Sequence, residues 1–168
     1  MNKHSLATSA VDLPDDRTVR VRRYFDAAPG QVYRAFSEPE LMQRWLAGPP
    51  GWQMTVCEMD MTVGGAYRWR WRSDADGAEF GFYGEMLEVD PPGKIAHTQT
   101  FDPGTMGGDM GEPAVITTRF EPDGSGTRMT VTIVYATAED CQKAMATGMT
   151  DGMEMSYARL DTVLATPG

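Results

Sequence analysis

Two histidines and two cysteines are the residues of this 168-residue chain best suited to binding a transition metal. His4 is close to the N-terminus and His97 is isolated, so neither has a partner at the short spacing of a zinc motif. Cys57 and Cys141 each lie in an apolar stretch, which is typical of small buried hydrophobic residues rather than of a disulfide. We therefore predict no metal site and no cofactor.

Common catalytic patterns are also missing from the sequence. Ser156 lies within an expected helix and not in a nucleophile elbow. The glycine-rich loop 102–113 lacks both the GxGxxG spacing and a following helix that would bind phosphate, so we interpret it as a hairpin loop at a cavity entrance. We predict no catalytic residue. An acid–base reaction at His97 or at a buried carboxylate, of the cyclase or hydrolase type, stays open as an alternative.

Aromatic residues and methionines form the pattern that does point to a function. Tyr67, Trp69 and Trp71 alternate with arginines, which predicts a strand with one apolar face. Residues between Met145 and Leu164 recur at spacings of three and four, which predicts one apolar face of a helix. Methionine side chains are flexible, and glycines in that stripe remove side-chain volume, so an adaptable cavity is expected between the two faces.

We predict that a small, mostly apolar ligand binds in this cavity. The expected ligand-binding residues are Tyr67, Trp69, Trp71, Phe80, Phe82, His97, Gln99, Met145, Met149, Gly152, Met153 and Tyr157. Of these, His97, Gln99 and the Tyr157 hydroxyl are expected to hydrogen-bond the ligand. The alternative is that the same side chains fill an ordinary core.

The elements that must position these residues follow from the hydrophobic periodicity. Residues 1–16 are expected to be a flexible leader and 17–168 a single domain. A strand over 18–25 is followed by two short helices, and the second helix leads to a Pro-Pro turn. Six further strands are expected, over 53–60, 67–72, 79–89, 95–101, 114–120 and 127–135. One long helix is expected from Thr137 to near the C-terminus. Short connections predict an antiparallel sheet that this helix covers on one face.

Charged residues are expected on solvated faces. Two groups of arginines alternate with apolar residues and are interpreted as the wet face of a sheet: Arg17, Arg20, Arg22 and Arg23, and Arg68, Arg70 and Arg72. Glu154 and Asp161 are placed on the solvated side of the last helix. The net charge of −9 and the pI of about 4.6 argue against binding nucleic acid or an anionic membrane. With no apolar run of membrane-spanning length, a cytoplasmic location is expected.

Several of these stretches together resemble a known family. They are Ala28-Pro29 before a helix, Pro39-Glu40-Leu41 leading to Trp45, Gly48-Pro49-Pro50-Gly51, Asp60 before Gly64-Gly65, Gly84 with Glu88 and Pro91, and the segment from Thr147 to Leu160. The set is similar to the heat-shock-protein ATPase activator homologue-like branch of the START-like (SRPBCC) superfamily. The resemblance implies an α+β helix-grip fold, in which a curved antiparallel sheet wraps around a long C-terminal helix, with two short helices after the first strand.

The resemblance leaves more than one function open, since relatives include carriers of apolar ligands, cyclases and a co-chaperone domain. An interaction module for a chaperone or another protein is the main alternative to ligand binding. It would use an exposed apolar patch formed by Trp45, Leu46, Trp52 and the Pro-Pro turn. A homodimer also stays open.

Overall fold

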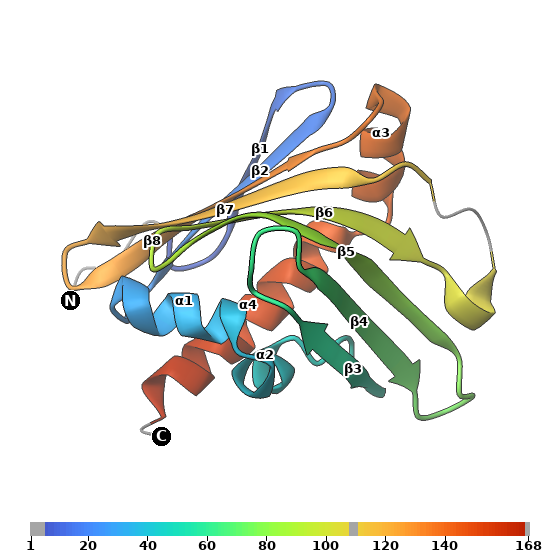
Figure 1. Ribbon diagram of the computed structural model, residues 1–168, viewed down its shortest axis with the longest axis horizontal. Helices are drawn as coiled ribbons and strands as arrows, with labels where there is room; N and C mark the ends of the chain where they lie inside the picture. Colours follow the sequence, from blue (N-terminus) through green and yellow to red (C-terminus); the bar gives the residue numbers. More distant parts are fainter. Residues whose placement is uncertain (1–5, 108–110, 167–168) are drawn as a thin grey trace.

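A computed structural model describes residues 6–107 and 111–166 of the chain. Its centre is an eight-stranded antiparallel sheet in the order β1-β2-β8-β7-β6-β5-β4-β3. Figure 1 shows the sheet curving around α1, α2 and α4, with α3 at the end of the sheet near the start of α4. The expected helix-grip arrangement is thereby confirmed. His4 and the central residues of the glycine-rich loop lie outside the described residues.

The elements have the following bounds. The strands are β1 (Ala10–Asp15), β2 (Thr18–Phe25), β3 (Trp52–Met59), β4 (Ala66–Ser73), β5 (Glu79–Asp90), β6 (Lys94–Asp102), β7 (Ala114–Asp123) and β8 (Gly126–Val134). The helices are α1 (Pro29–Ser37), α2 (Pro39–Trp45), α3 (Ala138–Ala146) and α4 (Met149–Ala165), with a short 3-10 turn, η1 (Gly104–Met106), after β6.

Strand alternation explains which side chains face the helices. On β4, Tyr67, Trp69 and Trp71 are 2%, 9% and 4% exposed, while Arg68 and Arg72 point away from the core and are exposed. Residues directly opposite in an antiparallel pair share a face, so the apolar face of β4 continues onto β5 and β6. The concave face of the sheet is therefore the core face, as the period-2 pattern predicts.

The C-terminal helical region is broken, where the sequence predicted one continuous helix from Thr137. The Thr137 hydroxyl accepts a hydrogen bond from the Asp140 amide at 3.0 Å and so begins α3 as expected. At Gly148, however, the backbone adopts φ +77°, a left-handed conformation that ends one helix before the next begins. Gly148 is thus a junction residue and does not lie on a buried helix face.

The N-terminal segment is also more ordered than predicted. Residues 10–15 form β1, which pairs with β2 and so extends the sheet by one edge strand. The Tyr24 amide donates to the Leu6 carbonyl at 2.8 Å, just before β1. Asp15 and Asp16, the last two residues of the expected leader, lie at the turn between the two strands. A polar hairpin in this position looks like a leader because most of its side chains are exposed, and it is held by backbone pairing with β2 and by hydrogen bonds from Arg20 to Asp12.

Arg23 corrects the assignment of the arginines to a solvated face. It lies on the concave side of β2, directly opposite Met129 of β8, and is 2% exposed. Its guanidinium donates to Glu154 at 2.9 and 3.0 Å and to Asp161 at 2.9 Å twice. The two carboxylates that were assigned to solvent therefore face the sheet and hold α4 against β2.

Candidate functional site

Five aromatic side chains gather on the concave face where β3 to β6 extend beyond the helices. We call Trp52, Trp71, Phe80, Phe82 and Phe101 the aromatic cluster. Trp71 stacks on Phe80 with ring centroids 5.2 Å apart, and Phe82 lies 5.8 Å from Trp71 and 5.6 Å from Phe101. Trp52 packs edge-on against Phe80 at 5.1 Å. The rings form one continuous surface contributed by four strands.

This surface is only partly covered by the rest of the protein. Trp71 is buried, but Trp52, Phe80 and Phe82 are half-buried and Phe101 is 38% exposed. In Figure 1 the far ends of β4 and β5 run past α4, so the helices do not close this end of the concave face. Contiguous exposed aromatic surface is characteristic of binding sites.

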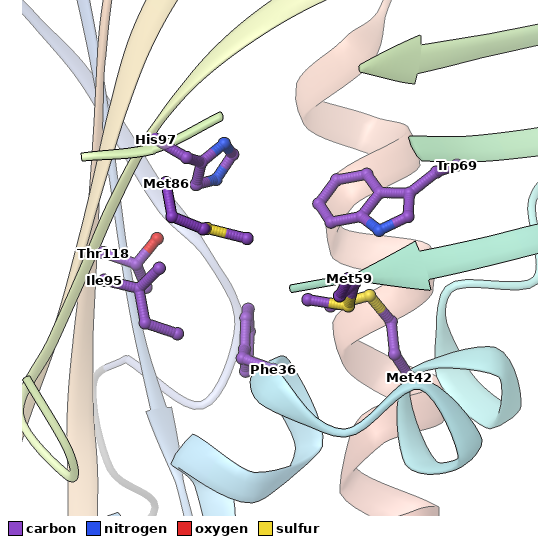
Figure 2. A pocket seen from close by; sticks show the side chains of 8 residues that line it. All are labelled: Phe36, Met42, Met59, Trp69, Met86, Ile95, His97 and Thr118. Atoms are coloured by element: carbon purple, nitrogen blue, oxygen red, sulfur yellow. The ribbon is translucent and has the colours of Figure 1, made fainter. Parts of the chain in front are cut away.

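Next to the aromatic cluster is a small internal cavity of about 30 Å³. It is lined by Phe36, Met42, Met59, Trp69, Met86, Ile95, His97 and Thr118 (Figure 2). A volume of this size holds about one water molecule, whereas pockets for small ligands measure about 300–1,000 Å³. The enclosed space is therefore much smaller than a cavity that would hold a small ligand.

His97 and Tyr67 form a buried hydrogen-bond network at this cavity. The Tyr67 hydroxyl donates to the Thr98 carbonyl at 2.5 Å. His97 Nδ1 lies 3.0 Å from the Tyr67 oxygen and 3.1 Å from the Thr98 carbonyl. A Cβ on Gly84 would lie 2.2 Å from the same carbonyl, so glycine is required for β5 to approach it. Since the single hydroxyl hydrogen of Tyr67 is used toward Thr98, and a carbonyl oxygen can only accept, we assign the ring hydrogen of His97 to Nδ1.

Burial sets the protonation of these groups. It lowers the pKa of His97, against a smaller upward effect of the Thr98 carbonyl, so the ring is neutral at pH 7. Because the ring hydrogen is on Nδ1, Nε2 has a free lone pair and can accept a hydrogen bond. Burial likewise raises the pKa of Tyr67, which stays protonated. The network is uncharged and can bind a polar group, but it supplies no charged acid or base.

The three buried tryptophans differ in how their indole N–H groups are satisfied. Trp45 Nε1 donates to the Ala35 carbonyl at 2.9 Å, and Trp71 Nε1 donates to the Leu46 carbonyl at 2.8 Å. Trp69 Nε1 is buried and has no hydrogen-bond partner. An unsatisfied buried donor costs about 1–3 kcal/mol of folding free energy, which makes this one notable at the cavity wall.

The structure brings together only part of the predicted ligand-binding set. Tyr67, Trp69 and His97 meet at the cavity, and Trp71, Phe80 and Phe82 belong to the aromatic cluster, with Gln99 half-buried on the same face of β6. Met149 and Met153 are half-buried on α4, where the Met149 sulfur accepts from the Tyr135 hydroxyl at 3.3 Å.

The remaining predicted residues lie elsewhere. Tyr157 packs between α4 and the first two helices, with its ring centroid 5.9 Å from Phe25 and 6.1 Å from Trp45. Met145 faces a separate surface groove between α3 and the turn of the β1–β2 hairpin. Gly152 is exposed, and a Cβ there would meet nothing within 4 Å.

Sequence reasoning missed several residues that line these surfaces. Phe101 ends the strand expected over 95–101 and follows Gln99 in the same alternation, so its place on the concave face was predictable, but it was not among the expected ligand-binding residues. Met59 is paired with Tyr67 across β3 and β4, and its position depends on a bulge between Met54 and Val56. Such a bulge has no clear signal in one sequence.

The patch proposed for protein interaction is not formed as expected. Trp45 is 2% exposed and packs against Phe36 with ring centroids 4.6 Å apart, so it belongs to the core. Leu46 is half-buried, and its carbonyl accepts the Trp71 indole N–H. Trp52 is half-buried within the aromatic cluster. The segment before the Pro-Pro turn thus closes the core.

Comparison with known proteins decides the family. The model of the Activator of Hsp90 ATPase homolog 1-like protein family matches residues 26–165. The chain belongs to this family. It is part of the SRPBCC superfamily, so the resemblance stated from the sequence is confirmed.

Solved structures agree with this assignment. A crystal structure of a protein from Rhodobacter sphaeroides is 27% identical, covers 94% of this chain and 97% of its own, and has a TM-score of 0.83. Protein Ms6760 from Mycobacterium smegmatis shares the fold at 23% identity, with 96% and 99% covered and a TM-score of 0.82. A protein from Arthrobacter aurescens is 26% identical, with 95% and 92% covered and a TM-score of 0.80. The search of curated proteins gave no match.

Within 6–107 and 111–166, no three His, Cys, Asp or Glu side chains are grouped as metal ligands would be. In the same part of the chain, every helix is too short or too polar to cross a membrane.

Proposed function

We propose that this protein binds a small, mostly apolar, planar ligand on the concave face of the sheet, with the aromatic cluster as the main wall of the site. The observation that carries the proposal is the incomplete cover of this cluster. Five rings from four strands lie in contact, yet Phe101 is 38% exposed and three others are half-buried. A planar ligand would bury this surface and gain ring-to-ring contacts with it.

The neighbouring side chains can adapt to a ligand. Met42, Met59 and Met86 line the adjoining cavity, and Met149 and Met153 are half-buried on α4. Methionine has three rotatable bonds and a polarizable sulfur, so it repacks around ligands of different shape at low cost. The small cavity can therefore widen toward the aromatic cluster when a ligand enters.

Thermal unfolding with a panel of flavonoids, polyketides, steroids and lipids tests this proposal. A ligand present at about 100 times its dissociation constant stabilises the folded state by about 2.7 kcal/mol. For a domain of this size, that corresponds to a midpoint about 5–11 °C higher.

A matched pair of variants localises the effect. Phe101 and Val115 are both 38% exposed, but Phe101 faces the concave side and Val115 the outer side of the sheet. The variant Phe101→Ser is expected to lose most of the ligand-induced rise, and Val115→Ser to keep it. An equal response of the two variants, or no rise with any compound, would refute the proposal.

A further inference from the structure

Methionine side chains gather at the small internal cavity. Three of the residues that line it are methionines from three different elements: Met42 of α2, Met59 of β3 and Met86 of β5. Met42 and Met86 are 2% and 1% exposed, and Met59 is half-buried. The space that they border measures about 30 Å³, which is about the size of one water molecule or one metal ion.

A histidine lines the same cavity. His97 of β6 is directly opposite Met86 in the β5–β6 pair. The Cβ atoms of such opposed residues are about 4.5–5.5 Å apart. Figure 2 shows Met86 beside His97 on one side of the cavity, and Met42 and Met59 on the other side. One imidazole and three thioether side chains therefore border a single small space.

Hydrogen bonds fix the orientation of the His97 ring. Nδ1 lies 3.1 Å from the Thr98 carbonyl oxygen and 3.0 Å from the Tyr67 hydroxyl oxygen, and the ring hydrogen is assigned to it. Nε2, which has the lone pair, points away from these two partners because it is on the other side of the ring. Histidines that bind metals almost always donate their second ring N–H to a backbone carbonyl, a carboxylate or water. His97 already makes this supporting contact.

The types of side chain in the lining select a soft metal ion of low charge. Thioethers favour Cu(I) and imidazole also binds copper, whereas magnesium and calcium prefer oxygen ligands. The described lining residues include no carboxylate and no cysteine. A monovalent ion suits them better than a divalent one, because burying a charge without a counter-charge becomes more costly as the charge increases.

The methionines can also close around an ion and admit it. Bonds to a metal are shorter than van der Waals contacts, so the side chains must move inward, and the three rotatable bonds of methionine permit this. Met59 is the last residue of β3, which is an edge strand of the sheet. Movement of this half-buried side chain would open a path to the cavity from the sheet edge.

We propose that the cavity is a binding site for one Cu(I) ion. Its ligands are the thioether sulfurs of Met42, Met59 and Met86 and the Nε2 atom of His97. This inference goes beyond the proposed function and does not depend on it, because no member of the aromatic cluster is among the described residues that line the cavity.

Silver(I) is the first probe, because it has the same charge and similar ligand preferences and stays in one oxidation state in air. Wild-type protein with ¹³C-labelled methionine methyl groups is titrated with Ag(I) in chloride-free buffer. The ¹H–¹³C signals of Met42, Met59 and Met86 are expected to change together and to reach saturation at one ion per chain. Met155, which is 45% exposed on α4, should stay unchanged. Unchanged signals of the three cavity methionines, or changes confined to Met155, would overturn the proposal.

Two buried methionines form a matched pair for measuring affinity. Met86 and Met129 are 1% and 0% exposed and both lie on strands, but of the two only Met86 lines the cavity. Replacing methionine by leucine preserves side-chain volume and is usually well tolerated. In anaerobic competition with the chelator bicinchoninate, Met86→Leu should bind Cu(I) about tenfold more weakly than the wild type or worse, and Met129→Leu as tightly as the wild type. Equal affinities of the two variants would refute the site.

The two cysteines are the competing ligands for Cu(I). Cys57 is half-buried and Cys141 is buried, and both are free thiols. The double variant Cys57→Ala with Cys141→Ala is expected to keep one Cu(I) ion per chain with nearly unchanged affinity. If this variant loses the ion while Met86→Leu retains it, the thiols are the ligands and the proposal is wrong.

Discussion

The ion-pair cluster around Arg23 makes a prediction whose size follows from burial. Arg23 is 2% exposed, while the side chains of Glu154 and Asp161 are 29% and 47% exposed. Neutralising both carboxylates, as in Glu154→Gln with Asp161→Asn, leaves an uncompensated cation in the core. Breaking a buried pair in this way costs about 3–5 kcal/mol.

Removal of the cation itself should cost less. In Arg23→Met the two carboxylates become unpaired, but both reach solvent and can hydrate, and methionine fills most of the vacated volume. We expect a loss of about 1–2 kcal/mol, within the range for hydrogen bonds to charged groups. Arg23→Met, which removes the cation of β2, is thus predicted to be more stable than the double variant, which removes both carboxylates of α4.

Urea and thermal unfolding at pH 7 measure this difference. For a domain of this size, a loss of 3–5 kcal/mol lowers the midpoint by about 6–20 °C, so the two variants are well separated. Neutralising Glu154 alone or Asp161 alone should lower the midpoint less, because Arg23 keeps one charged partner. If Arg23→Met unfolds at a lower temperature than the double variant, the buried cation is not the group that needs compensation, and the reasoning fails.

Three other predictions concern the glycines at and in α4, two buried tryptophans, and the pH dependence of stability. Gly152→Ala should raise the free energy of unfolding by about 0.5–1 kcal/mol, because Gly152 is helical and a Cβ there meets open space. Gly148→Ala should lower it, because alanine is strained at φ +77°. Urea midpoints that move in the same direction for both variants would contradict this. In thermal unfolding, Trp69→Phe should lose about 1–3 kcal/mol less stability than Trp71→Phe. The first variant removes an unsatisfied donor, whereas the second leaves the Leu46 carbonyl without its partner. Burial raises the pKa of Glu154, but hydrogen bonds from Arg23 and Ser9 outweigh this effect and lower the pKa below its ordinary 4.5. Its stabilising contribution is therefore complete above pH 4.5 and lost as the pH falls further, and melting curves of Glu154→Gln should depend less on pH in that window.

The sheet was predictable because its pattern is local. The alternation of Tyr67, Trp69 and Trp71 with arginines fixes which face of β4 is buried, and short connections fix the antiparallel pairing. The concave face followed from these rules, and with it most residues of the aromatic cluster. Phe101, the last residue of the strand expected over 95–101, lies on this face by the same alternation.

What the sequence did not reveal depends on contacts between distant segments. Whether Gly148 interrupts a helix or lies within it is decided by its backbone angles, and glycine is compatible with both. Arg23 became a core residue because two carboxylates, 131 and 138 positions away, reach it from α4. The size of the cavity depends on how methionine side chains from several elements pack, which periodicity does not specify.

The central claim is that ligands bind on the concave face beside the aromatic cluster, and the methionine methyl groups can report on it directly. A ¹H–¹³C spectrum of methyl-labelled protein titrated with 2-naphthol is expected to show concentration-dependent shifts for Met59 and Met86, which line the cavity. Met145, in the groove beside α3, should stay unchanged. Shifts confined to Met145, or saturation without any change at Met59 and Met86, would contradict the account.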